Sequence, residues 1–90
     1  MKHYNIRVKG TVQGVWYRDS ARRKALELGV NGFVRNEDDG SVYIEAEGEE
    51  EALKKLTDWC RKGPERAQVD KVEVEEGAIK NFNGFERRRL

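Results

Sequence analysis

Hydrophobic and polar residues alternate along several short segments of this chain, a period that is typical of strands with one buried face. In the first of these segments, Tyr4, Ile6 and Val8 alternate with polar residues over positions 3–8. The other predicted strands cover residues 30–35, 41–47 and about 69–74, and a short edge strand covers 85–89.

Between these segments, apolar residues recur at helical spacing in two places. A helix over residues 17–28 would place Ala21, Ala25 and Leu28 on one face, and Gly29 would end it. A second helix over residues 49–62 begins with three glutamates and ends with basic residues, which complements its dipole. Its apolar stripe consists of Ala52, Leu53, Leu56 and Cys60, with Trp59 alongside.

The second and third predicted strands are joined by residues 36–40, which end in the turn-forming pair Asp39-Gly40. This connection predicts a β-hairpin. Matching the side-chain faces across the turn favours a register with Val34 opposite Val42 and Phe33 opposite Tyr43.

The predicted order of elements is strand, helix, strand, strand, helix, strand, with an extra strand at the end. Two helices with apolar stripes must cover one face of the sheet, and short connections favour right-handed crossovers. We therefore predict an α+β fold, a ferredoxin-like split βαβ sandwich with an antiparallel or mixed sheet. Residues 1–90 are expected to form a single domain, because the chain shows no repeat, linker or low-complexity segment.

The charge balance argues against a partner that is attracted by long-range electrostatics. Lysine and arginine number 18 against 17 aspartates and glutamates, a net charge of +1. Attraction to nucleic acid or to an anionic membrane is therefore not predicted. No apolar run is long enough to cross a membrane, and the N-terminus lacks a signal-peptide pattern, so we expect a cytoplasmic protein.

Soft-metal chemistry is equally poorly supported by the composition. Cys60 is the only cysteine and His3 the only histidine, too few for such a metal site. The alternation in the first strand points His3 outward, so we interpret it as a surface residue. Cys60 is expected to be a small, partly buried apolar side chain.

The connection between the first strand and the first helix has the composition of an anion site. Residues 9–18 read KGTVQGVWYR, with two glycines and an arginine at the start of the helix. A glycine turn can leave backbone N–H groups unpaired, and the helix start is electropositive. The positive Arg18 at this positive helix end is easier to explain if an anion binds between them.

The stretch GTVQGVWYR at 10–18, followed by GFVRNEDDGSV at 32–42, resembles the two signature motifs of the acylphosphatases. Gly48, the segment Val69 to Val72 and Phe85 also fit, so the resemblance covers nearly the whole chain. It implies hydrolysis of acyl phosphates to a carboxylate and inorganic phosphate, without a metal or cofactor. We expect the protein to be a monomer.

The resemblance also implies roles for individual residues. Arg18 would hold the phosphate, and Asn36 would orient the attacking water. The phosphate oxygens would be surrounded by backbone N–H groups of the loop, which belong to Gln13, Gly14, Val15, Trp16 and Tyr17. The residue after Asn36 departs from the pattern, because some acylphosphatases have threonine where this chain has Glu37. A carboxylate there could repel the substrate or alter the pH dependence.

Two alternatives stay open from the sequence. RNA-recognition modules share the predicted order of elements, and Phe33 and Tyr43 would lie on the uncovered sheet face, although Glu45 and Glu47 lie there as well. A non-catalytic phosphate-binding module is the second, because acylphosphatase-like domains also begin larger hydrogenase-maturation proteins. Since the chain ends at residue 90, we expect a free-standing hydrolase.

Overall fold

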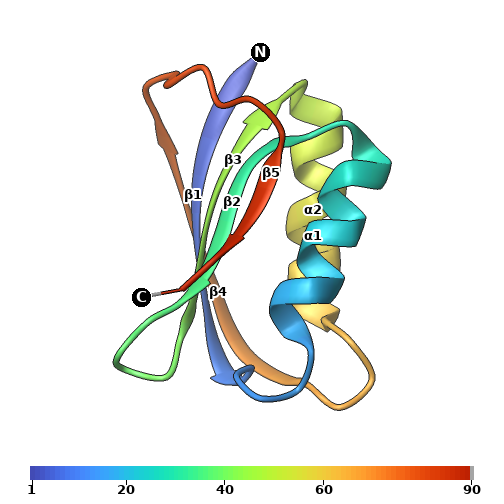
Figure 1. The fold of residues 1–90 in the computed structure, drawn as a ribbon, viewed down its shortest axis with the longest axis vertical. Helices are drawn as coiled ribbons and strands as arrows, with labels where there is room; N and C mark the ends of the chain where they lie inside the picture. Colours follow the sequence, from blue (N-terminus) through green and yellow to red (C-terminus); the bar gives the residue numbers. More distant parts are fainter. Residues whose placement is uncertain (90) are drawn as a thin grey trace.

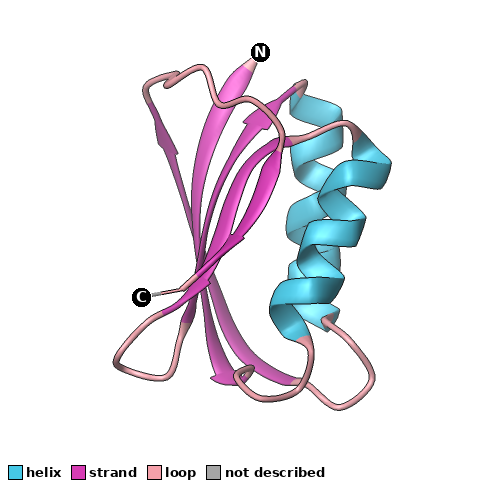
Figure 2. Cartoon of the chain, viewed as in Figure 1, coloured by secondary structure: helices cyan, strands magenta, loops and turns pink. Residues whose placement is uncertain are grey.

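The computed structural model describes residues 1–89 and has the predicted order of elements (Figures 1 and 2). The strands form one sheet in the order β4-β1-β3-β2-β5. Only the β2–β5 pair is parallel, so the sheet is mixed, and both helices lie on the same face of it. This arrangement confirms the ferredoxin-like α+β prediction. The elements are β1 (Lys2–Thr11), α1 (Tyr17–Leu28), β2 (Asn31–Asn36), β3 (Val42–Gly48), α2 (Glu50–Lys62), β4 (Gln68–Gly77) and β5 (Phe85–Arg88).

The core lies between the sheet and the helices and uses the apolar positions that the periodicity predicts. Ile6, Val34 and Ile44 project from the sheet and are fully buried. Ala21, Ala25, Leu53, Leu56 and Cys60 meet them from the helices. Neither helix in the described part of the chain is long and apolar enough to span a bilayer.

Tyr17 fixes the start of α1 against α2. Its side chain is buried, and its hydroxyl donates a hydrogen bond of 2.7 Å to the carbonyl of Cys60. The ring centroids of Tyr17 and Trp59 lie 5.3 Å apart. Burial raises the pKa of the Tyr17 hydroxyl far above its ordinary value, so it remains a donor. The first turn of α1 is therefore held in place from within the core.

The predicted register of the hairpin is wrong by two residues. Val34 pairs with Ile44 rather than Val42, and Phe33 pairs with Glu45 rather than Tyr43. The reason is that Asn36 belongs to β2 and pairs with Val42, which moves the turn to residues 37–41. A shift of two residues leaves every side chain on its own face, so the hydrophobic pattern cannot distinguish the two registers.

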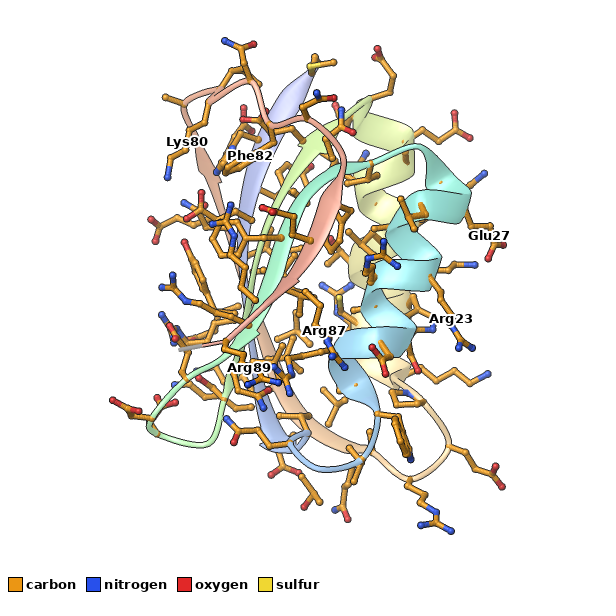
Figure 3. All side chains as sticks on the ribbon, in the orientation of Figure 1. Arg23, Glu27, Lys80, Phe82, Arg87 and Arg89 are labelled. Carbon is orange, nitrogen blue, oxygen red and sulfur yellow. The ribbon has the colours of Figure 1, made fainter. Side chains whose placement is uncertain are left out.

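The expectation that His3 lies on the surface is also wrong. Its side chain is 1% exposed, and its Nδ1 and Nε2 lie 2.7 Å from oxygens of Glu47 and Asn5 respectively. The connection from β4 to β5 crosses this part of the sheet and carries Lys80 and Phe82 (Figure 3). The backbone N–H groups of both residues donate to the Glu47 carboxylate. The face opposite the helices is therefore partly covered.

Candidate active site

A pocket of about 210 Å³ lies where the loop after β1, the first turn of α1 and the ends of β2 and β5 meet. Two of the predicted functional side chains, Arg18 and Asn36, line it together. They come from different elements, α1 and β2, and only the fold brings them to one place. The other lining residues are Val12, Gly14, Trp16, Tyr17, Asp19 and Arg87.

The loop wall of the pocket turns through two residues with left-handed backbone conformations. Gly14 has φ 73° and Trp16 has φ 66°. Glycine adopts this conformation without steric cost, whereas tryptophan does not. The Trp16 side chain is 71% exposed, so burial of the ring does not explain its position. Strain of this kind is typical of backbone held in place for a function.

The helix start supplies unpaired donors next to this loop. Trp16 is the N-cap of α1 and makes no capping hydrogen bond through its side chain. Its carbonyl accepts the first backbone bond of the helix, from the N–H of Ser20 at 3.1 Å. The N–H groups of the first turn therefore have no partner within the helix. Together with the helix dipole they favour an anion at this point.

Arg18 is half-buried beside these donors. One of its guanidinium nitrogens, Nη1, donates to the carbonyl of Arg88 at 3.1 Å. This bond links the first turn of α1 to β5 and fixes the direction of the side chain. A guanidinium carries five N–H donors, so the bond to Arg88 leaves others for a ligand in the pocket.

Asn36 faces the pocket from the end of β2. It lies two residues after Val34 and so shares the helix-covered face of the sheet. Its Oδ1 is buried and has no hydrogen-bond partner among the described residues. A buried acceptor without a donor costs about 1–3 kcal/mol, which makes this oxygen a candidate for contact with a ligand.

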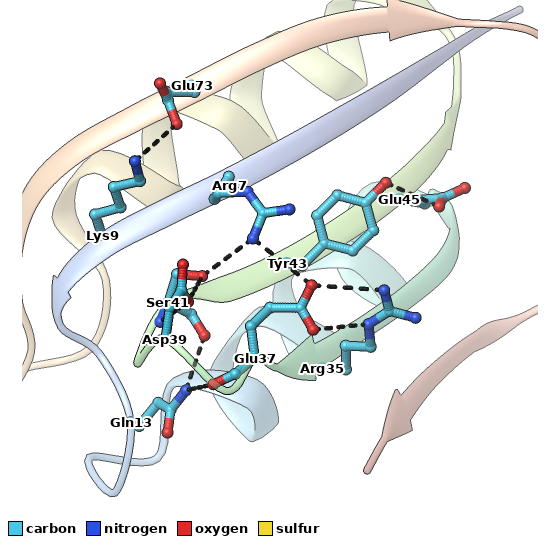
Figure 4. A network of polar contacts seen from close by, with 10 residues as sticks. All are labelled: Arg7, Lys9, Gln13, Arg35, Glu37, Asp39, Ser41, Tyr43, Glu45 and Glu73. Carbon is cyan, nitrogen blue, oxygen red and sulfur yellow. Dashed lines mark hydrogen bonds and ion pairs between the residues drawn. The ribbon is translucent and has the colours of Figure 1, made fainter. Parts of the chain in front are cut away.

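Gln13 supports the site through its side chain. Its Nε2 donates to the carbonyls of Glu37 and Ser41, each at 2.8 Å (Figure 4). The loop that precedes Arg18 is thereby tied to the turn that follows Asn36. The sequence predicts only a backbone role for Gln13, and this side-chain link connects the two halves of the site. Gln13 and Val15 do not line the pocket, and Val15 packs against the core.

Glu37 points away from the pocket, to the opposite face of the sheet. Its carboxylate lies 3.1 Å from Arg35 Nε and 3.6 Å from Arg7 Nη1 (Figure 4). These two cations neutralise it on the far side of the sheet from Asn36. The departure from the family pattern at Glu37 therefore places no carboxylate beside the Asn36 amide.

Arg87 is a charged residue of the pocket that lies outside both sequence motifs. It lines the pocket from β5 and forms an ion pair with Asp19, 2.9 Å from Nη1 to Oδ1. Figure 3 shows Arg87 directed from β5 toward the first turn of α1. One signal was present in the sequence: Phe85 and Arg87 are two residues apart on the same strand and so share a face.

The fold and the site define a small α+β protein with a pocket between a glycine loop, an arginine and an amide. The chain belongs to the acylphosphatase family, whose model matches residues 4–87. Its reaction is the hydrolysis of acyl phosphates, which are small-molecule substrates. The paired motifs of the sequence predicted this family.

Two relatives named acylphosphatase cover most of the chain. The protein of Methylococcus capsulatus is 52% identical over 88% of this chain and 86% of its own length. That of Marinobacter nauticus is 50% identical over 94% of both chains. The crystal structure of acylphosphatase from Bacillus subtilis superposes with a TM-score of 0.95 at 34% identity, over 98% of this chain and 99% of that one.

Proposed function

We propose that Arg18 and the N–H groups of the loop 13–17 bind the phosphoryl group, and that Asn36 orients the water that attacks it. The observation that carries this assignment is that Asn36, whose buried Oδ1 has no hydrogen-bond partner among the described residues, lines the same pocket as Arg18. An amide oxygen accepts a hydrogen bond from water and so directs the water's lone pair away from itself. Arg18 supplies the complementary group, because a guanidinium binds phosphate oxygens with parallel N–H donors.

The proposed reaction needs little proton transfer from the protein. The water oxygen forms a bond to phosphorus, and the bond between phosphorus and the acyl oxygen breaks. The electron pair leaves with the carboxylate, whose pKa of about 4 makes it a good leaving group without an acid. The proton of the water passes to a phosphoryl oxygen. Phosphoryl transfer of this kind depends mainly on positioning and on charge stabilisation.

The charges of the pocket match this requirement. Arg18 and the electropositive start of α1 face the equatorial phosphoryl oxygens, where negative charge is spread in the transition state. Fixed donors of this type are each worth about 10²–10³-fold in rate. Trp16 and Val12 form an apolar wall of the same pocket, which we assign to the part of the acyl group next to the phosphoryl group.

The RNA-binding alternative is disfavoured by the state of Phe33, one of its two proposed base-stacking residues. Phe33 is only 3% exposed. The guanidinium of Arg88 lies 4.0 Å from its ring centroid, and the Phe82 ring packs against it edge-on at 5.7 Å. A covered ring offers no platform for a base.

We propose a single domain over residues 1–90 that acts as a cytoplasmic monomer without a metal or cofactor and without nucleic acid as partner.

A hydrolysis assay with benzoyl phosphate in the presence of a chelator tests the assignment. The wild type should turn over, and Arg18→Gln and Asn36→Ala should each lose at least about 100-fold in kcat/KM. Arg23→Gln is the matched control, because this exposed α1 arginine carries the same charge and does not line the pocket. Full activity of either site variant would refute its role. Phosphate binding by a wild type without turnover would instead favour a non-catalytic module.

A further inference from the structure

A second pocket of about 430 Å³ continues from the catalytic pocket along α1 and β5. The two pockets share two lining residues, Asp19 and Arg87. The ion pair between these residues therefore lies on the boundary between the two spaces. A substrate whose phosphoryl group occupies the first pocket can extend its acyl group past this pair into the second. Its remaining lining residues are Arg22, Phe85 and Glu86.

The Asp19–Arg87 pair is poorly suited to a purely structural role. Its two side chains are 36% and 44% exposed. Ion pairs between groups this exposed contribute little to stability, so a ligand can compete for Arg87 at small cost. Only Nη1 of Arg87 contacts Asp19. The other donors of the guanidinium are available to a second anion.

Arg22 adds a further cation to the second pocket. It lies one helical turn after Arg18, about 6 Å further along the axis of α1. Its Nε donates to the carbonyl of Phe85 at 3.1 Å, which holds the side chain against β5. Two acidic residues line this pocket, Asp19 and Glu86, and Glu86 is bound by Arg88 at 2.8 Å. The pocket therefore presents Arg22 and Arg87 against the single competing carboxylate of Asp19.

We propose that this second pocket is a subsite for the acyl group and that it selects acyl phosphates whose acyl chain bears a carboxylate. Arg87 is the specificity-determining residue, and Arg22 supports it from α1. The proposal rests on the proposed binding of phosphate at Arg18, which sets the end of the substrate from which the acyl group extends. A neutral acyl group gains nothing from these arginines, so the discrimination is between substrates that differ in charge.

Two simpler roles for Arg87 give different results and are separable. If Arg87 only neutralises Asp19, its loss would lower kcat/KM for every acyl phosphate to a similar degree. The unpaired Asp19 would then repel the phosphate group of each substrate. If Arg87 is a second ligand of the phosphoryl group, its loss would also weaken competitive inhibition by inorganic phosphate. The subsite predicts a larger loss of kcat/KM for the substrate with the carboxylate than for the neutral one, beyond any loss that the unpaired Asp19 causes to both.

The test compares 4-carboxybenzoyl phosphate with 4-methylbenzoyl phosphate. The ring keeps the carboxylate from attacking its own acyl group, and electronic differences cancel when variants are compared with the wild type. We expect Arg87→Gln to lower kcat/KM about 5–10-fold more for the carboxylated than for the methylated substrate, and to weaken inhibition by phosphate no more than it lowers kcat/KM for the methylated substrate. Arg87→Lys should restore part of the preference, and Arg23→Gln should leave the ratio of the two substrates unchanged.

Equal losses for both substrates, or no loss for either, would overturn the subsite while leaving the assignment of Arg18 and Asn36 intact. A wild type that hydrolyses neither substrate would overturn the proposed function, and the subsite with it. Circular dichroism of Arg87→Gln shows whether the variant is folded. Arg22→Gln offers an independent variant in the same pocket, with a smaller selective loss expected.

Discussion

Replacing Gln13 by alanine should separate the two halves of the active site without touching the pocket. The side-chain amide of Gln13 donates two hydrogen bonds of 2.8 Å, to the carbonyls of Glu37 and Ser41. These carbonyls flank the turn that begins directly after Asn36. Gln13→Ala therefore unties the phosphate loop from the hairpin while Arg18 and Asn36 both remain present.

The expected size of the effect follows from the two bonds. A hydrogen bond contributes about 0.5–1.5 kcal/mol net, so the free energy of unfolding should fall by about 1–3 kcal/mol. The activity should fall further than this loss of stability suggests. A displacement of about 1 Å between reacting groups costs about 10²-fold in rate. We expect kcat to fall 10–100-fold by this estimate, while inhibition by inorganic phosphate, which does not depend on Asn36, changes less.

Gln13→Glu is the matched variant that tests whether the Gln13 side chain acts as the donor in these hydrogen bonds. It preserves the size of the side chain but replaces the two N–H donors by a carboxylate that faces two carbonyl oxygens. Both variants should be folded by circular dichroism, and steady-state kinetics on benzoyl phosphate should show Gln13→Glu to be at least as impaired as Gln13→Ala. Retention of wild-type kcat in Gln13→Glu would refute the link between the loop and the hairpin.

Three further predictions concern individual side chains. Trp16→Gly should raise the free energy of unfolding by about 0.5–1 kcal/mol, because glycine relieves the left-handed strain of an exposed residue, and it should raise KM for benzoyl phosphate by removing an apolar wall of the pocket. Thermal unfolding and steady-state kinetics measure the two effects, and a loss of stability would show that the ring packs usefully. Glu37→Gln should keep kcat/KM within about threefold of the wild type, because the carboxylate is paired with Arg7 and Arg35 on the far face of the sheet; a tenfold change would show that its charge reaches the pocket. Burial opposes ionisation of Glu47, but hydrogen bonds from Lys80, His3 and Phe82 outweigh it and lower the pKa of this carboxyl below its ordinary value of 4.5. Ionised Glu47 therefore stabilises the fold above that value, and the contribution is lost as the pH falls through the lower pKa of the folded state. Urea unfolding at pH 7 and at about pH 3 should show that Glu47→Gln is less stable than the wild type at neutral pH and loses less on acidification, and parallel pH curves for the two proteins would contradict this account.

The elements of the fold could be predicted from the sequence because their periodicities are clear. The residues of α1 and the end of α2 were predicted as the structure has them, since Gly29 and Gly63 mark the ends of both helices. The register of the hairpin was not, because a two-residue shift preserves the faces of all side chains. Turn chemistry decides it instead: the Ser41 N–H and hydroxyl both bond the Asp39 carboxylate, and the Glu37 N–H bonds the Ser41 carbonyl.

The position of His3 could not be predicted from alternation alone. The pattern correctly assigns it to the face away from the helices, but it says nothing of what covers that face. The covering residues Lys80 and Phe82 lie in the connection between β4 and β5, which has no regular period. Their N–H groups bond Glu47, which in turn bonds His3. Long-range packing of an irregular segment leaves no local signal in the sequence.

In the candidate site, too, some residues could be predicted from the local sequence and others only from the fold. Arg18 and Asn36 lie in the two sequence motifs, and the structure brings both to one pocket. Arg87 lies outside the motifs, in a short strand whose neighbour in the sheet could not be known. Its place in the pocket follows from the parallel pairing of β2 with β5, which sets Arg87 beside Val34 on the helix-covered face. Such a pairing between distant segments is a property of the fold rather than of the local sequence.

Competitive inhibition by inorganic phosphate during benzoyl phosphate hydrolysis directly tests whether Arg18 binds the phosphoryl group and Asn36 orients the water. It separates binding of the phosphoryl group from orientation of the water. We expect Arg18→Gln to weaken phosphate inhibition at least tenfold, about the worth of one charged hydrogen-bonded contact. Asn36→Ala should retain the wild-type inhibition constant within about threefold while its kcat falls at least about 100-fold. Unchanged phosphate inhibition in Arg18→Gln, or wild-type kcat in Asn36→Ala, would contradict these roles.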